Sequence, residues 1–199
     1  MTIIVDDLVT AVGTVLDDPN NDRWSVIEHL DAVNRAVSII SRLKPETTIV
    51  HVPAHPLIAG ARQTLPAGAI TIADVKSNTD GTTTRSLVRT TLADLHQASP
   101  QWLDWAIDTP STEWAPDPSN IKSFYISPPR GGSTPGTAAI DVYQPPGDSA
   151  LGDEFPLDYV WIPPVREYML YSAWLKDAEY ANDPARAKLH NDFFTAALA

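Results

Sequence analysis

Two histidines four residues apart, His51 and His55, have the most ligand-like spacing in the chain. On a helix this spacing would place two imidazoles on one face, as zinc sites require. Pro53 and Pro56 exclude a helix here, and on an extended chain the two residues would lie roughly 13 Å apart. No third histidine and no carboxylate cluster lies nearby in the sequence. We therefore predict a surface strand at this position rather than a metal site.

Other catalytic patterns are missing or incomplete. The sequence Gly131-Gly-Ser-Thr-Pro135 resembles a nucleophile elbow, but its second glycine is not at the required spacing and no helix follows. The chain has no cysteine, which excludes disulfides, thiolate metal ligands and cysteine nucleophiles. We predict that the protein is not an enzyme and has neither metal nor cofactor. A hydrolase with an unrecognised site remains a minor alternative, which substitution of His51, His55 and Asp158 would test.

The charge of the chain limits its possible partners. Its 199 residues carry 25 acidic and 14 basic side chains and a net charge of −11. Proteins that grip a DNA duplex cluster Lys and Arg, and this sequence has no such cluster. The net charge therefore disfavours tight binding of nucleic acid. It still allows a protein that lines a channel through which DNA slides. The chain has no apolar run near the roughly 20 residues that cross a bilayer, and we expect no membrane partner.

The placement of proline predicts where helices form, because proline interrupts helix interiors. Most of the 18 prolines lie within residues 100–164, and both ends of the chain contain proline-free windows. Apolar residues at spacings of three and four predict one helix before residue 17 and a second that begins after Ser25, where Glu28 completes a capping box. Two further helices are predicted after the prolines at 163–164, separated by a break at residues 182–184.

The middle of the chain is predicted to be β-rich. Strands are expected at 47–52, 62–65, 69–75, 84–89, 122–127 and 137–143, with a short helix at 91–98. Pro128–Gly136 is predicted to be a long exposed loop. The resulting fold class is α+β: a four-helix bundle formed by the terminal helix pairs (residues 1–45 and 162–199), with an antiparallel β-rich subdomain (residues 46–161) inserted between them.

Because no catalytic site is predicted, the candidate functional residues are surface contacts. The chain has six tryptophans, and aromatic residues near loops are enriched at protein interfaces. Packing in a seam between the β-rich part and the bundle is an equally good interpretation of these aromatics. The candidate contacts with partners are Trp102, Trp105, Arg130, Trp174, Phe193, Phe194 and Leu198.

Four segments, spread over nearly the whole chain, resemble parts of one protein family in the same order. Ser25–Arg35 is similar to the start of its second helix, and Gln63–Val75 is similar to its first β hairpin. Pro116–Pro129 resembles a strand that ends in paired prolines, and Tyr168–Ala187 resembles the closing helix pair. The family is that of the head-to-tail adaptor (connector) proteins of short-tailed bacteriophages.

This resemblance implies a structural protein of the virion, without catalysis or cofactor. Such adaptors form a twelve-subunit ring beneath the portal protein, and the ring carries the DNA channel onward to tail nozzle or tube proteins. DNA passes through the lumen without specific binding. The bundle would build much of the ring, the β part and loops would meet tail proteins, and the C-terminal region would engage the portal. We expect a location in the neck between capsid and tail, after assembly in the host cytoplasm; the alternative is another neck, tail-completion or nozzle protein.

Overall fold

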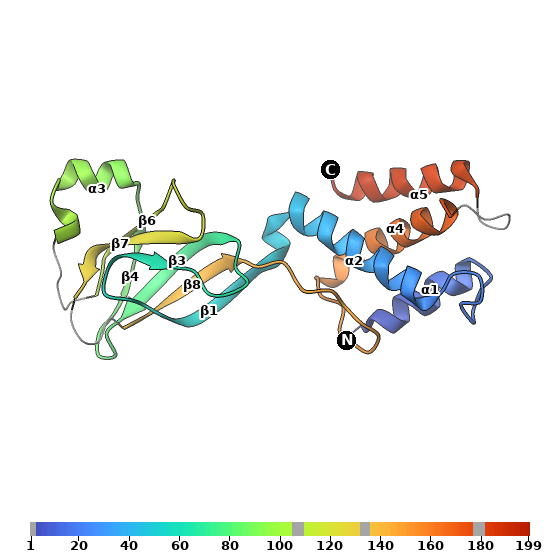
Figure 1. Ribbon diagram of the computed structural model, residues 1–199, viewed down its shortest axis with the longest axis horizontal. Helices are drawn as coiled ribbons and strands as arrows, with labels where there is room; N and C mark the ends of the chain where they lie inside the picture. The colour runs from blue at the N-terminus through green and yellow to red at the C-terminus, as the bar shows by residue number, and fades with distance from the viewer. Residues whose placement is uncertain (1–2, 105–109, 132–135, 177–181) are drawn as a thin grey trace. The chain divides into compact units, whose positions relative to one another are not determined.

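The computed structural model describes residues 3–104, 110–131, 136–176 and 182–199. The chain divides into two compact units, a helical unit of Met1–Thr48 and Pro146–Ala199 and a β-rich unit of Ile49–Pro145. The described residues form five α-helices and two four-stranded sheets (Figure 1), which confirms the predicted α+β class.

Residues 146–161, which we expected in the β-rich insertion, belong instead to the helical unit. The cause is a short backbone pairing between this segment and the start of the chain. The N–H of Val5 donates to the carbonyl of Asp153 at 2.9 Å, and the N–H of Phe155 donates to the carbonyl of Ile3 at 2.9 Å. These long-range hydrogen bonds tie a segment without regular structure to the first helix, and no local sequence signal predicts them.

The helical unit contains four of the five α-helices. Ser25 and Glu28 form the predicted capping box: the Ser25 side chain accepts from the Glu28 N–H, and the Glu28 carboxylate accepts from the Ser25 N–H at 2.8 Å. Pro163 and Pro164 lie in the first turn of the helix that begins at Ile162, and Pro184 is the first residue of the last helix. Their missing N–H groups cost nothing there, because N–H groups in a first turn have no partner within the helix. The helices are α1 (Val5–Val15), α2 (Val26–Leu43), α4 (Ile162–Trp174) and α5 (Pro184–Ala197).

One apolar core joins these helices, and every helix contributes buried side chains to it. Apolar residues recur at spacings of three and four, so each helix buries one face. The core includes Val5, Leu8 and Val12 of α1, Val33, Val37 and Ile40 of α2, Val165 and Met169 of α4, and Phe194 of α5. No helix in the described part of the chain is both long and apolar enough to cross a bilayer.

The turn between α1 and α2 is built around one buried carboxylate. Asp18 is 4% exposed, and its side chain accepts hydrogen bonds at 2.9 Å from the backbone N–H groups of Asp22, Arg23 and Trp24. Burial by itself would raise the pKa of Asp18, but these three backbone donors outweigh it, so the pKa lies below its ordinary value. The ionised carboxylate thus fixes the chain immediately before the Ser25 cap.

The described residues of the β-rich unit form two sheets, one short α-helix and one 3-10 helix. The first sheet has the strand order β1-β8-β3-β4 and the second has the order β2-β7-β6-β5. The elements are β1 (Ile49–Pro56), β2 (Gly60–Thr64), β3 (Thr71–Thr79), β4 (Thr84–Ser86), β5 (Val88–Arg89), α3 (Leu92–Ala98), β6 (Glu113–Pro116), β7 (Ser123–Arg130) and β8 (Thr137–Tyr143).

Side chains of both sheets share one core. Trp114, Phe124 and Ile126 of the second sheet join a cluster with Ile140 and Val142 of the first. All five are fully buried. Burial against a facing sheet explains the alternation of buried and half-buried residues along β8.

Several details of the β-rich unit differ from the sequence predictions, and strand β6 was not predicted at all. The predicted strand at 84–89 is divided at Leu87, because β4 pairs with the first sheet and β5 with the second. The pairing of β5 with β6 is parallel, so the insertion is not purely antiparallel; α3 lies between the two strands and supplies the crossover that a parallel pair requires. Strand β7 continues through Pro128 and Pro129 to Arg130, so the predicted loop begins later than expected.

Candidate interaction surfaces

The two histidines with ligand-like spacing are held by different partners. The Nδ1 of His51 lies 2.7 Å from Oδ1 of Asp141, whereas the Nε2 of His55 lies 2.7 Å from the backbone carbonyl oxygen of Thr64. The His51 side chain is exposed, and His55 is buried. Across the described residues, no group of three or more His, Cys, Asp or Glu side chains is placed to hold a metal ion.

Asp141 is the centre of a charge ladder across three strands of the first sheet. Besides contacting His51 of β1, its carboxylate lies 3.2 Å from the Nζ of Lys76 on β3, and Lys76 also contacts Asp74 at 2.7 Å. The hydrogen bond with His51, followed by that with Lys76, holds the pKa of Asp141 below its ordinary value. The Asp141 carboxylate is therefore ionised near neutral pH, and its contacts join β1, β8 and β3.

The seven predicted contact residues are divided between the two units. Trp102 and Arg130 are buried in the β-rich unit, at 2% and 1% exposure. Trp105 lies outside the described residues. The helical unit holds the other four, which are Trp174, Phe193, Phe194 and Leu198.

Trp102 is a packing residue of the β-rich unit. Its ring meets those of His96 and Tyr125 edge-to-face, with centroid distances of 5.9 and 6.0 Å. Its indole Nε1 donates to Nδ1 of His96 at 3.3 Å, and Leu95 and Ala115 share the same small core. In this conformation the ring joins the region of α3 to β7 and has almost no surface to offer a partner.

Trp174 is half-buried at the end of α4 and joins three segments of the helical unit. Its ring meets that of Trp24 edge-to-face at a centroid distance of 6.0 Å. The guanidinium of Arg186, in the first part of α5, lies 4.8 Å from the Trp174 ring centroid, which is a cation–π geometry. The remaining exposed part of Trp174 therefore lies beside a basic side chain.

The two sides of α5 differ sharply. Phe194 is 3% exposed and its ring lies 5.0 Å from that of Tyr168 on α4, and Leu198 packs against the same core. On the other side, Phe193 is 55% exposed and Leu189 is 51% exposed. Leu189, Phe193 and the exposed Ala197 recur every four residues and form an apolar row that we call the α5 stripe. Leu189 was missed by the sequence interpretation, although its spacing from Phe193 was a usable signal.

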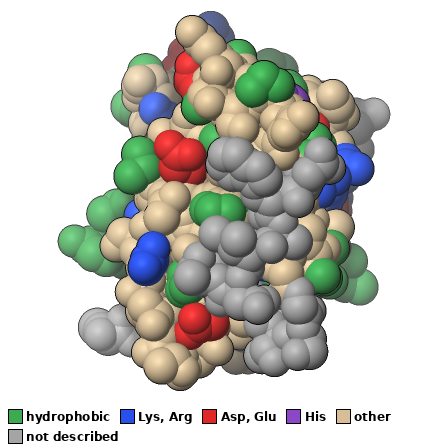
Figure 2. All heavy atoms as spheres, turned by 90° about the vertical axis from the view of Figure 1, so that its left-hand side faces the viewer, with side chains coloured by type: hydrophobic (Ala, Val, Ile, Leu, Met, Phe, Trp, Pro, Cys, Tyr) green, Lys and Arg blue, Asp and Glu red, His purple; other side chains and the backbone are tan. Residues whose placement is uncertain are grey.

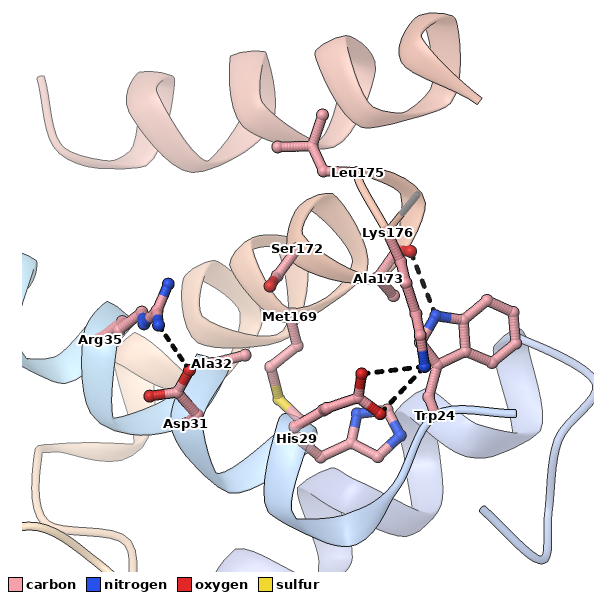
Figure 3. Close-up of a pocket in the computed structure, with 11 residues that line it drawn as sticks. Trp24, His29, Asp31, Ala32, Arg35, Met169, Ser172, Ala173, Leu175 and Lys176 are labelled. Carbon is pink, nitrogen blue, oxygen red and sulfur yellow. Dashed lines mark hydrogen bonds and ion pairs between the residues drawn. The ribbon is translucent and has the colours of Figure 1, made fainter. Parts of the chain in front are cut away.

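A pocket of about 330 Å³ lies between α2 and α4 (Figure 3). Its lining mixes apolar and polar side chains. Two ion pairs lie at the pocket: Lys176 with Glu28 at 2.8 Å and Arg35 with Asp31 at 2.7 Å. The hydrogen bond from Lys176 lowers the pKa of Glu28, so the first pair is ionised near neutral pH. The apolar lining residues are Trp24, Ala32, Met169, Ala173 and Leu175. Its walls come from opposite ends of the chain, so no sequence motif marks the pocket.

His29, which also lines this pocket, should make the helical unit sensitive to mild acid. It is 2% exposed, and its Nε2 has no hydrogen-bond partner within the described residues. Burial lowers the pKa of His29 below 6.5, despite the opposing effect of the Asp18 and Glu28 carboxylates. The unfolded state therefore binds a proton first as the pH falls, and the free energy of unfolding should decrease from about pH 6.5 downward.

Urea unfolding followed by circular dichroism at pH 7.5 and 5.5 measures this effect. The wild-type protein should be less stable at the lower pH. The variant His29→Leu should lose most of this difference, because it has no imidazole to protonate in the unfolded state. An equal pH dependence in both proteins would show that His29 is not responsible.

The described residues at the α3 end of the β-rich unit show no patch of clustered basic side chains. Figure 2 shows that the described Lys and Arg side chains on this face lie singly and do not gather into a patch. Phosphate backbones are held by clustered basic side chains.

Comparison with known proteins identifies the family of the chain. A search of curated proteins finds no match. The family model described as SU10 adaptor protein matches residues 3–199, which is nearly the whole sequence and includes both units. This match confirms the resemblance to phage head-to-tail adaptors that the four ordered segments indicate. The chain thus belongs to the SU10 adaptor protein family, a family of phage head–tail adaptors and structural proteins of the virion.

Proposed function

We propose that this protein forms a ring, of twelve subunits, that joins the portal protein to the tail of a phage virion and continues the DNA channel. The observation that carries the proposal is the family match over residues 3–199. An adaptor family implies contacts with portal and tail components, and its members are structural rather than catalytic. We further propose that the protein assembles in the host cytoplasm and resides in the neck between capsid and tail.

The two units suit different tasks within such a ring. We propose that α1, α2, α4 and α5 act as a four-helix bundle that builds the ring wall, since all four contribute to one core. Residues 1–45 and 162–199 supply the bundle, residues 146–161 are attached to it, and the remaining residues form the inserted part. The loops of the β-rich unit then meet the nozzle or tube proteins, and the C-terminal region meets the portal.

The charge of the chain supports a channel through which DNA slides rather than a protein that holds DNA. A ring around DNA must let the duplex slide, and basic side chains facing the lumen would hold it through phosphate contacts. With 25 acidic against 14 basic side chains, subunits of this protein repel a phosphate backbone on average. The DNA accordingly passes without specific binding.

Cryo-electron microscopy of the purified protein mixed with the portal of the same phage tests the proposal. The expected result is a ring of this protein directly against the portal, with twelve copies per portal by native mass spectrometry. Portal must be present, because ring formation is expected on that template. A protein that stays monomeric and leaves the portal bare would contradict the proposal. Labelled protein found in the virion, but at a distance from the portal, would instead favour a tail-completion or nozzle protein.

A further inference from the structure

We propose that the α5 stripe of one subunit docks into the pocket between α2 and α4 of the next subunit. This inference rests on the proposed ring, and it names the contact that joins neighbouring copies. The partner is therefore a second copy of this chain. The stripe is the apolar row of Leu189, Phe193 and Ala197, and the pocket is the one drawn in Figure 3.

The stripe is apolar surface that the helical unit leaves uncovered. Two neighbouring phenylalanines on α5 show the contrast: Phe194 is 3% exposed and Phe193 is 55% exposed. A single exposed apolar residue needs no explanation, but large apolar side chains one helical turn apart form a continuous row. Such rows on amphipathic helices are the usual anchors for grooves on partner proteins.

The pocket offers apolar surface between charged walls. Its volume of about 330 Å³ is at the lower end of the range of ligand sites, roughly 300–1,000 Å³, and suits a few anchoring side chains. Met169 and Ala173 give it an apolar floor. Leu175, which is 51% exposed, adds apolar surface at its edge. Aromatic anchors that fill desolvated pockets are the typical centres of protein interfaces.

Charge makes these two surfaces suitable for contact between copies of an acidic chain. Copies with a net charge of −11 repel one another wherever unpaired carboxylates meet. Near the stripe, however, Lys188 neutralises Asp192 and Arg186 neutralises Asp183. At the pocket, Lys176 and Arg35 neutralise Glu28 and Asp31 in the same way. The described acidic side chains bordering stripe and pocket are thus paired within their own subunit.

The positions of the two surfaces dictate the symmetry of the contact. On α4, Tyr168 contacts Phe194 of α5, whereas Met169 and Ala173 line the pocket beside α2. Stripe and pocket are therefore different surfaces of the same unit. Repeated contact between two different surfaces is heterologous, and such contacts form a ring when the rotation between neighbouring copies closes.

Cysteine cross-linking tests this contact cleanly, because the natural chain has no cysteine. Ser172 lines the pocket and Phe193 lies on the stripe, so the full-length double variant Ser172→Cys/Phe193→Cys should form disulfides between neighbours. After assembly on the portal and mild oxidation, we expect a ladder of covalent oligomers on a denaturing gel. Each single variant should give at most a trace of dimer.

A matched control moves the second cysteine to the other side of the same helix. Ser172→Cys/Thr195→Cys places it at an exposed position of α5 outside the stripe, and it should give a much weaker ladder under the same oxidation. Rings that assemble on the portal without a ladder specific to Phe193→Cys would overturn this contact while leaving the proposed function intact. Failure of any ring to form with wild-type protein would overturn the proposed function, and this inference with it.

Discussion

Replacing Gly136 by alanine should lower the free energy of unfolding of the β-rich unit by about 3 kcal/mol or more. Gly136 has a φ of +83°, and a Cβ added to it would lie 1.9 Å from the carbonyl oxygen of Thr79. Neither backbone can easily retreat. Thr79 pairs with Thr137 between β3 and β8, and the carbonyl of Gly136 accepts the N–H of Leu57 at 3.0 Å. Relief of the clash therefore breaks sheet pairing.

Gly81→Ala is the matched control for this prediction. Gly81 also has a positive φ, +94°, but an added Cβ there would meet no atom within 4 Å. Its substitution should cost only the conformational strain, roughly 1–2 kcal/mol. Urea unfolding followed by tryptophan fluorescence reports on this unit, because Trp114 lies in its core. Equal losses in the two variants would mean that close backbone approach at Gly136 contributes nothing.

The helices were predictable because their signals are local. Ser25 and Glu28 lie within one turn of each other, so the start of α2 could be identified without knowing the rest of the fold. The division of residues 84–89 between two sheets was not predictable in this way. It depends on pairing of β4 with β3 and of β5 with β6, and such pairing is decided by contacts distant in sequence. The attachment of residues 146–161 to α1 has the same origin.

Prediction from sequence is limited in the same way for the single residues of the candidate surfaces. Helical phase separates Phe193 from Phe194, because Phe194 lies seven residues after the buried Ala187 and shares its face. The sequence interpretation nevertheless named both phenylalanines, and the buried Trp102, as candidate contacts. The pocket between α2 and α4 could not be predicted, since Glu28 and Lys176 meet only when the two ends of the chain pack together.

Replacing Asp18 by alanine should lower the free energy of unfolding of the helical unit by about 3 kcal/mol. Three buried or half-buried N–H groups, those of Asp22, Arg23 and Trp24, would lose a charged acceptor at once. Water cannot readily replace it, because Asp18 is only 4% exposed. The damage should extend to the start of α2 and to the pocket that Trp24 lines. Urea unfolding followed by far-ultraviolet circular dichroism measures the loss.

The neighbouring acid Asp22 provides the control, because its backbone donates to Asp18 while its own side chain is exposed. Asp22→Ala keeps that donor and should change stability by less than about 0.5 kcal/mol.

The pKa of Asp18 is lowered from 3.8 in the folded protein, so its contribution is complete above that pH and is lost as the pH falls further. The deficit of Asp18→Ala should therefore be full at pH 7 and shrink in stronger acid. A deficit independent of pH would show that the carboxylate acts through its shape rather than its charge.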